Sequence, residues 1–126
     1  MKNIEIIEEE KIFERVSQLG RTFLSELRYL KSLNCVGEFR GIGFLYGIEL
    51  VADKQTKEPA ADELLGKIIA ACKEKGLIIG RNGDTIPGYQ NVLILAPPLS
   101  STEEDLHFLV DTVRTVIKEH DLKQPY

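Results

Sequence analysis

The segment VGEFRGIGFLYGIELV, residues 36–51, constrains the fold more than any other part of the sequence. Its branched aliphatic and aromatic residues favour β-strands, and four glycines divide them. Two such runs joined by a short glycine-containing connection are typical of neighbouring strands linked by a tight turn or a bulge. The segment therefore predicts a pair of strands.

Amphipathic patterns on both sides of this segment predict helices. In residues 8–31 apolar side chains recur at steps of three and four, so that they form one face of a helix. A second pattern covers residues 62–75, and Gly76 fits the position just after a helix end. Both patterns are long enough for helices that pack one face against a sheet.

The last helix is predicted to begin after Thr102 and to extend to about residue 120. The Thr102 side chain can cap it, with Asp105 at the third helical position. Leucine and valine side chains then recur along one face, which indicates a third helix that covers the core.

Two short apolar runs predict a second strand pair, residues 77–80 and 92–96. The second run is stopped by Pro97–Pro98, because proline has no N–H to donate to a neighbouring strand. Residues 52–60 are polar and end near a proline, so we expect a loop there.

The predicted order is helix, strand pair, helix, strand pair and helix. It fits one domain over residues 1–126 of the α+β class, with two layers: a small, mainly antiparallel sheet and helices packed on one face. Ile4, Ile6 and Ile7 precede the first helical pattern with little local sequence to pack against. Either they dock on the sheet, or they join this domain to something before it.

Composition and charge argue against several classes of function. The net charge of −4 and the isoelectric point near 5.2 disfavour nucleic acid as a partner, which needs a basic surface. The first residues turn acidic where a signal peptide has its apolar core, and no apolar run approaches the ~20 residues that cross a bilayer. Two cysteines, Cys35 and Cys72, cannot form a four-ligand metal site, and neither has a histidine at ligand spacing. We therefore expect a cytoplasmic protein with buried, reduced thiols and no metal site.

The residues with catalytic potential have simpler explanations. His107 and His120 fall on the polar side of the last predicted helix, where they are solvated. We assign the acidic runs at residues 8–10 and 103–105 to helix N-termini, where the helix dipole favours negative charge. Arg40 lies inside the first strand pair, where we expect it to hold backbone or a nearby carboxylate. The sequence therefore names no catalytic residue.

Arg81 has a position that suggests binding. It follows the predicted strand 77–80 and opens a polar loop with turn signals at Asn82–Gly83 and Pro87–Gly88. A guanidinium can bind a carboxylate through two parallel hydrogen bonds. A single exposed arginine is usually only a surface charge, so position alone leaves Arg81 as a candidate for holding an anionic ligand.

Two motifs in fixed order resemble a known family. VGEFRGIGFLYGIELV and, downstream, GLIIGRNGDTI followed by VLILAPPLSSTEEDL resemble the small C-terminal domain of class III (ω-type) aminotransferases. The resemblance extends over about residues 3–118. It implies a dimeric parent enzyme of fold type I that uses pyridoxal 5′-phosphate to transfer an amino group between an amine or amino acid and a keto acid.

The resemblance also implies roles for two arginines. In many family members an arginine at the position of Arg81 binds the carboxylate of the substrate, and it can swing away to admit an amine that lacks one. Arg40 matches the family's RGxG pattern, where the resemblance implies a structural role.

The catalytic lysine and the cofactor-binding residues of the family precede the region that this chain resembles. The lysines of the predicted helices fall on faces exposed to water, and we transfer no catalytic role to them: Lys67, Lys73, Lys75 and Lys118. We therefore expect a domain or fragment of an aminotransferase that is inactive alone. It would bind no cofactor by itself and would need a large domain or a partner chain.

Two other interpretations stay open. The chain could be a standalone, non-catalytic binding or interaction module that reuses this domain, since small α+β domains carry many functions. It could also be a cloned fragment or a pseudogene product, which is physically equivalent to the aminotransferase domain described above. In a fragment, the face that met the large domain is exposed and apolar, and we expect it to drive self-association.

Overall fold

A computed structural model of the chain describes residues 1–83 and 85–123. A five-stranded sheet has the order β1-β2-β5-β4, and a short β3 pairs with the far end of β2. All pairings between the described strands are antiparallel. The strands are β1 (Val36–Ile42), β2 (Leu45–Asp53), β3 (Glu58–Pro59), β4 (Gly80–Arg81) and β5 (Val92–Leu95).

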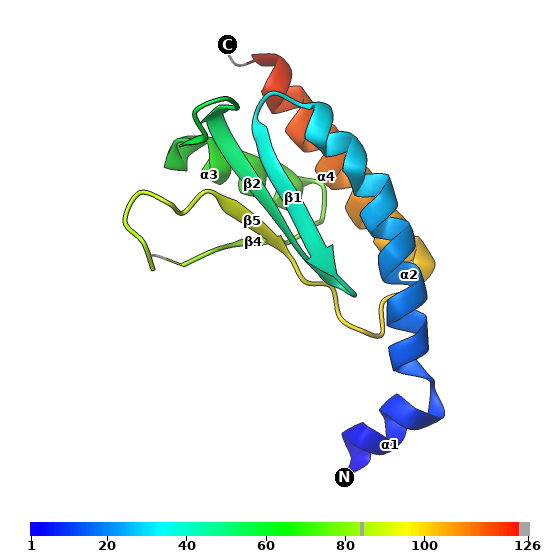
Figure 1. The fold of residues 1–126 in the computed structure, drawn as a ribbon. Coiled ribbons are helices and arrows are strands. Elements are labelled where there is room, and N and C mark those ends of the chain that lie inside the picture. Colours follow the sequence, from blue (N-terminus) through cyan, green and yellow to red (C-terminus); the bar gives the residue numbers. More distant parts are fainter. Residues whose placement is uncertain (84, 124–126) are drawn as a thin grey trace.

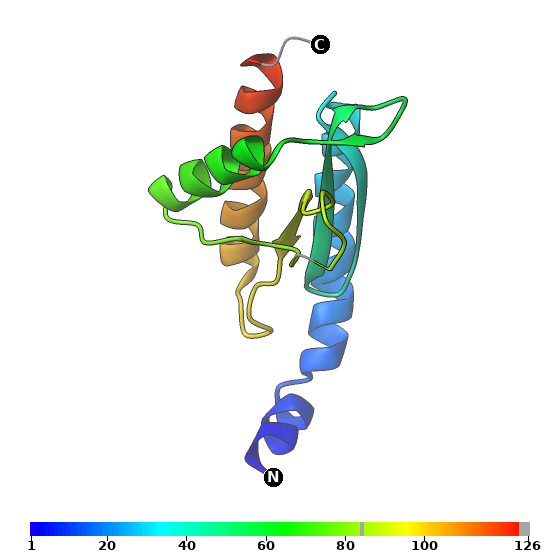
Figure 2. The ribbon, with the colours of Figure 1, turned by 90° about the vertical axis from the view of Figure 1, so that its left-hand side faces the viewer.

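The helices form the second layer. Figure 1 shows α3 and α4 behind the sheet and α2 alongside β1, and Figure 2 shows the same layers from the side. Helix α4 packs against both α2 and α3. This arrangement confirms the predicted α+β fold. The helical segments are α1 (Lys2–Glu9), α2 (Ile12–Leu27), the 3-10 helix η1 (Arg28–Ser32), α3 (Asp62–Glu74) and α4 (Glu103–Lys123).

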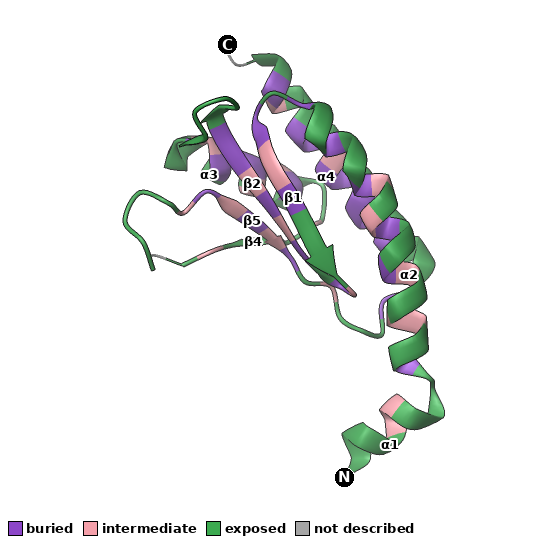
Figure 3. Ribbon diagram, in the orientation of Figure 1, coloured by how far each residue is buried: buried purple, intermediate pink, exposed green. Residues whose placement is uncertain are grey.

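The core lies between the helices and one face of the sheet (Figure 3). Alternate residues of β2, Tyr46, Ile48 and Leu50, are almost wholly buried there, because side chains along a strand point to opposite faces in turn. Phe23 from α2 and Val113 from α4 belong to the same cluster. The other face of the sheet is open among the described residues.

The first predicted helix is wrong in its extent. The structure breaks it at Lys11, whose φ of 49° is left-handed, and ends α2 at Leu27 before η1. Helix α1 buries no residue and contacts α2, so Ile4, Ile6 and Ile7 do not dock on the sheet. Because α1 has no core to pack against, its apolar residues cannot stabilise one continuous helix.

The acidic run at residues 8–10 also lies elsewhere than predicted. Glu8 and Glu9 stand in the last turn of α1, and Glu10 is its C-cap residue. Negative charge is unfavourable at a helix C-terminus, which gives a physical reason for the break that follows. The second run, residues 103–105, does lie in the first turn of α4.

The capping prediction for α4 is confirmed. The Thr102 Oγ1 accepts a hydrogen bond from the Asp105 backbone N–H at 3.1 Å, and the Asp105 carboxylate accepts one from the Thr102 N–H at 2.8 Å. This reciprocal pair satisfies two N–H groups that have no partner within the helix. Arg15 of α2 adds hydrogen bonds to the carbonyls of Leu99 and Ser101, so α2 holds the segment that leads into α4.

The predicted strand at residues 77–80 is mostly absent, and only Gly80 and Arg81 pair with β5. Gly76 follows α3 in the left-handed region, and the Leu77 N–H donates to the carbonyl of Cys72, so Leu77 still belongs to the helix end. On the partner side β5 stops at Leu95, before the two prolines. The expected loop at residues 52–60 contains the short strand β3, which extends the edge of β2.

Both cysteines are buried, as expected. Burial raises the pKa of the Cys72 thiol to about 11, so it stays protonated at neutral pH and is a poor nucleophile. Within the described residues no helix is long and apolar enough to cross a membrane. The same residues hold no group of three or more metal-ligating side chains.

Candidate functional site

Arg81 stands on the edge strand of the sheet. It pairs with Leu93 of β5, and directly paired residues of antiparallel strands project to the same face. Leu93 is buried on the helix side, so Arg81 also projects toward the helices, beyond the edge of the core. Its side chain is 36% exposed.

The guanidinium of Arg81 meets the first residue of α3. Its Nη1 donates to Oδ1 of Asp62 at 2.9 Å, and the Asp62 side chain is 69% exposed. The contact uses one nitrogen and one oxygen, whereas a bidentate pair would use two of each. Within the described part of the chain, Arg81 has no other ion-pair or hydrogen-bonding side chain, and its side chain is partly open to solvent.

Asn82 fixes the backbone directly after Arg81. Its side-chain amide donates to the carbonyl of Tyr89 at 2.8 Å, and its Oδ1 accepts from the N–H of Val92 at 3.0 Å. Its own N–H donates to the carbonyl of Val92 at 3.0 Å. One side chain therefore closes the base of the loop 82–91 and holds Arg81 at the sheet edge.

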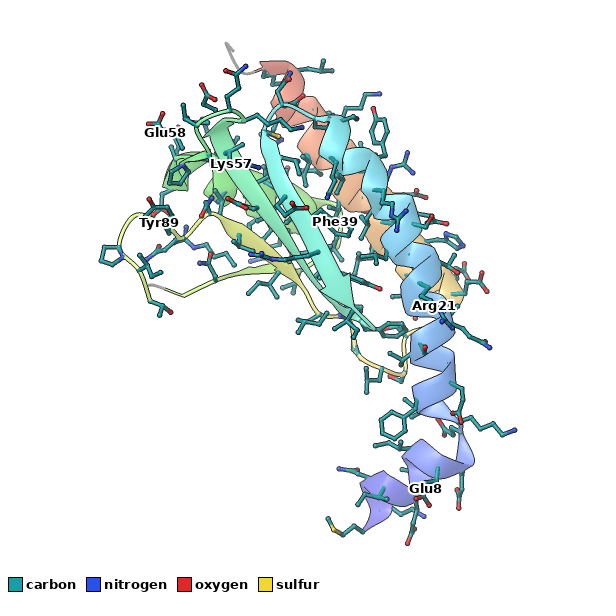
Figure 4. The ribbon with its side chains drawn as sticks, in the orientation of Figure 1. Glu8, Arg21, Phe39, Lys57, Glu58 and Tyr89 are labelled. Carbon is teal, nitrogen blue, oxygen red and sulfur yellow. The ribbon has the colours of Figure 1, made fainter. Side chains whose placement is uncertain are left out.

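The far end of the loop is anchored by Asn91. This buried side chain donates to the carbonyl of Leu50 at 2.7 Å, and the Leu50 N–H donates to the Asn91 carbonyl at 2.8 Å. Between the anchors the described loop residues are mostly exposed, and Figure 4 shows Tyr89 on the loop, outside the sheet.

The turn predicted at Pro87–Gly88 is confirmed. The Tyr89 N–H donates to the carbonyl of Ile86, and Gly88 has a φ of 84°, as a type II turn requires at its third residue. The other predicted turn, at Asn82–Gly83, stays a prediction, although the Asn82 side chain bridges the loop. Asp84, which follows it, lies outside the described residues.

Arg40 does not do what the sequence suggested. It projects from β1 on the open face of the sheet, and it is exposed. Among the described residues no carboxylate or carbonyl accepts a hydrogen bond from it, so the predicted tie to backbone or carboxylate is wrong. Arg40 and two further basic residues, Arg28 and Lys31, line a depression of about 520 Å³ beside β1.

Among the described residues, the two histidines and the helical lysines have ordinary surroundings. His107 is exposed, as predicted, and its ring meets Phe23 edge-on at 5.1 Å between ring centres. His120 is half-buried, and its Nδ1 lies 2.8 Å from the carbonyl oxygen of Val116. The four helical lysines named above are exposed, as predicted, and Lys67 pairs with Glu63 at 2.7 Å.

Sequence reasoning missed Asp62 and Asn82, which give Arg81 its surroundings. Asn82 carried a signal, because asparagine before glycine marks a turn, but the signal did not reveal a bridge across the loop. Asp62 carried the signal of an acidic residue in a first helical turn, which the dipole explains without any partner. Its pairing with Arg81 depends on where α3 sits relative to β4.

Comparison with known proteins places this chain among aminotransferases. The model of the aminotransferase class-III family matches residues 1–117. The uncharacterized aminotransferase YhxA of Bacillus subtilis is 54% identical over 114 residues, which are 90% of this chain and 25% of that protein. The taurine–pyruvate aminotransferase of Rhodobacter capsulatus is 35% identical over 119 residues, covering 94% of this chain and 26% of the relative.

Solved structures agree. An aminotransferase of Bacillus anthracis superposes with a TM-score of 0.89 at 48% identity, over 94% of this chain and 26% of that one. The adenosylmethionine-8-amino-7-oxononanoate aminotransferase of Methanocaldococcus jannaschii gives a TM-score of 0.79 at 40% identity, over 92% and 25% of the two chains. The chain thus spans about a quarter of the length of the relatives that it matches. With a family match over nearly its whole length, the chain belongs to the class III aminotransferases.

Proposed function

We propose that this chain is the small C-terminal domain, or a fragment, of a pyridoxal-phosphate-dependent class III aminotransferase. Its length, about a quarter of its relatives, leaves room for a large domain that supplies the cofactor site. The helices cover one face of the sheet, and the open face offers that domain a surface to pack against. The dimeric state of the intact enzyme and its cytoplasmic location belong to the same proposal.

The residues of this chain do not fit a complete cofactor site. In intact members the cofactor would supply the amino-transfer chemistry, and a lysine would hold it covalently before substrate binds. Such a lysine is activated by desolvation or by a neighbouring cation. Lys67, Lys73, Lys75 and Lys118 are all exposed on helices instead. We therefore assign no chemical step to this chain, and we infer that it transfers no amino group when alone.

Within the intact enzyme, Arg81 binds the carboxylate of the substrate. The observation that carries this role is the accessible guanidinium at the sheet edge, which is held by a single contact to Asp62. The anchors at Asn82 and Asn91 fix the loop base, so the side chain can move while its backbone stays in place. Relatives named for taurine and pyruvate act on pyruvate, whose carboxylate is the kind of group that a guanidinium binds.

The test uses a chimaera in which this chain replaces the corresponding quarter of the Bacillus subtilis relative. With an amino acid as donor, Arg81→Gln should raise KM about 10- to 100-fold, because a hydrogen-bonded charge pair is lost. With an amine donor that lacks a carboxylate, the first half-reaction should be unchanged. Arg40→Gln serves as the matched control and should change neither the KM for the amino acid nor the half-reaction with the amine. Equal losses for both donors would contradict the role of Arg81.

The chain alone gives a separate test of the missing cofactor site. After titration with pyridoxal phosphate and reduction with borohydride, peptide mapping should find no lysine modified stoichiometrically. One lysine modified at full occupancy would mean that the chain binds the cofactor by itself, against this proposal.

A further inference from the structure

The ion pair between Arg81 and Asp62 joins two elements, β4 and α3. Arg81 lies on β4 and Asp62 opens α3, 19 residues earlier in the chain. Asp62 sits in the first turn of α3, where the helix dipole favours its negative charge whether or not Arg81 is present. Its carboxylate is therefore a fixed partner at which the flexible arginine side chain can rest.

Space is available beside this pair. Asp62 lines a depression of about 360 Å³ between the start of α3 and the loop 82–91, to which Gly88 and Gln90 also contribute. A small anion approaching Arg81 from this side meets the carboxylate of Asp62 first. Both negative groups then compete for one guanidinium.

We propose that Asp62 is the resident counter-ion of Arg81 and that a substrate carboxylate must displace it. This inference rests on the proposed role of Arg81 and adds a positioning residue to it. The resident contact joins one nitrogen to one oxygen, whereas an incoming carboxylate can form two parallel hydrogen bonds. Displacement is therefore favoured when a carboxylate is present, and Arg81 returns to Asp62 when the substrate lacks one.

The competition is weak by its physical nature. Both partners are substantially exposed, and an exposed ion pair contributes little free energy. The contact with Asp62 can therefore weaken the binding of a carboxylate to Arg81 by no more than about fivefold. A contact of this strength draws the arginine away from amines that lack a carboxylate, without preventing the binding of acids. Asp62 thus tunes the preference of the site between substrates with and without a carboxylate.

Nuclear magnetic resonance of the 126-residue chain tests the proposal with sodium pyruvate as the probe. The Nε–Hε signal of Arg81 is identified by its loss in Arg81→Lys and is followed during titration. Asp62→Asn should bind pyruvate about two- to fivefold more tightly than the parent chain. Without pyruvate, its Arg81 guanidinium should rotate faster about the Nε–Cζ bond. Asp62→Glu should restore both properties.

The matched control is Glu63→Gln, which removes a negative charge from the next residue of the same helical turn. It should leave pyruvate affinity and guanidinium rotation as in the parent chain. Should Asp62→Asn fail to fold, Asp62→Ser tests the same point, because serine is favoured at helix starts.

The outcomes separate this inference from the proposed function. If Arg81 responds to pyruvate equally in the parent chain and in Asp62→Asn, the role of Asp62 is overturned while that of Arg81 stands. If Glu63→Gln tightens binding as much as Asp62→Asn does, the effect is general charge and the inference is again overturned. If Arg81 responds in none of the proteins, the competition is overturned, whereas the carboxylate-binding role of Arg81 in the intact enzyme is decided by the chimaera.

Discussion

Glu38 of β1 is held in its charged form by two neighbours. Its carboxylate accepts a hydrogen bond from Lys31 Nζ at 2.6 Å and another from the Phe39 backbone N–H at 2.9 Å. These contacts, with Lys31 the largest contributor, lower the pKa of Glu38 from 4.5 to about 2. Because the folded-state pKa lies below the ordinary value, the stabilisation is fully present above pH 4.5 and is lost as the pH falls toward 2.

Glu38→Gln should therefore flatten the acid dependence of stability between pH 4.5 and pH 2, as measured by urea unfolding at a series of pH values. A double-mutant cycle with Lys31→Gln isolates the pair from other acidic groups, such as Asp53 and Asp105, whose pKa values are also lowered by backbone N–H groups. The coupling should be present at pH 6 and largely lost near pH 2. A coupling that is the same at both values would contradict the assignment to Glu38.

At the scale of single residues, the sequence located Arg81 but not its surroundings. Its place at a strand end follows from local pattern, and β4 does end at Arg81. The contact with Asp62 and the bridges made by Asn82 depend on how α3, β4 and the loop are placed in space, which no local pattern records. For Arg40 the sequence predicted a partner that the described residues do not provide. A strand pattern predicts where a residue lies, but not whether a partner stands opposite it.

Helix α2 and the β1–β2 turn approach so closely that one glycine of the helix is required. A Cβ added at Gly20 would lie 2.5 Å from the carbonyl oxygen of Gly43, which turns the chain with a φ of 57°. The backbone atoms of this turn cannot move aside, as the end of a flexible side chain could. Gly66 of α3, by contrast, has nothing within 4 Å of the same added atom.

We therefore expect opposite effects from the same substitution in the two helices. Gly66→Ala should stabilise the chain by up to about 1 kcal/mol through helix propensity alone. Gly20→Ala should destabilise it by about 1–3 kcal/mol, because the clash exceeds that gain. Chemical denaturation measures both. A Gly20→Ala variant as stable as Gly66→Ala would show that the contact with Gly43 is not rigid.

At the scale of elements, the amphipathic patterns located the helices and the two strand pairs, and they failed where tertiary contacts decide. The apolar residues before residue 12 fit a helical period, yet only a surface to pack against turns such a period into one continuous helix, and α1 has none. The run at residues 77–80 is apolar enough for a strand. However, Leu77 belongs to the end of α3, and within the run only Gly80 pairs with β5.

The molecule as a whole is a two-layer domain in which, among the described residues, one face of the sheet is uncovered. Ile42 and Leu45 are directly paired across β1 and β2 on the open face, and they are 83% and 57% exposed. Ile78, 85% exposed, lines a groove of about 620 Å³ at the edge of the sheet, where β5 and the start of α4 also contribute. Large exposed apolar patches normally mark interfaces, and these side chains are the candidates for one. In the proposed intact enzyme, the remaining three quarters of the protein would cover it.

Without that cover, we expect the chain to associate with itself through the same face. Sedimentation velocity over a wide concentration range should show mass above that of the monomer, and Ile42→Ser combined with Ile78→Ser should return it toward monomer. Leu122→Ser, at the far end of α4 and 77% exposed, removes an apolar side chain of similar size outside this face and should change nothing. A parent chain that stays monomeric at high concentration would contradict the prediction. It would mean that the glycines and charged residues of the sheet face interrupt its apolar surface enough to keep two copies apart.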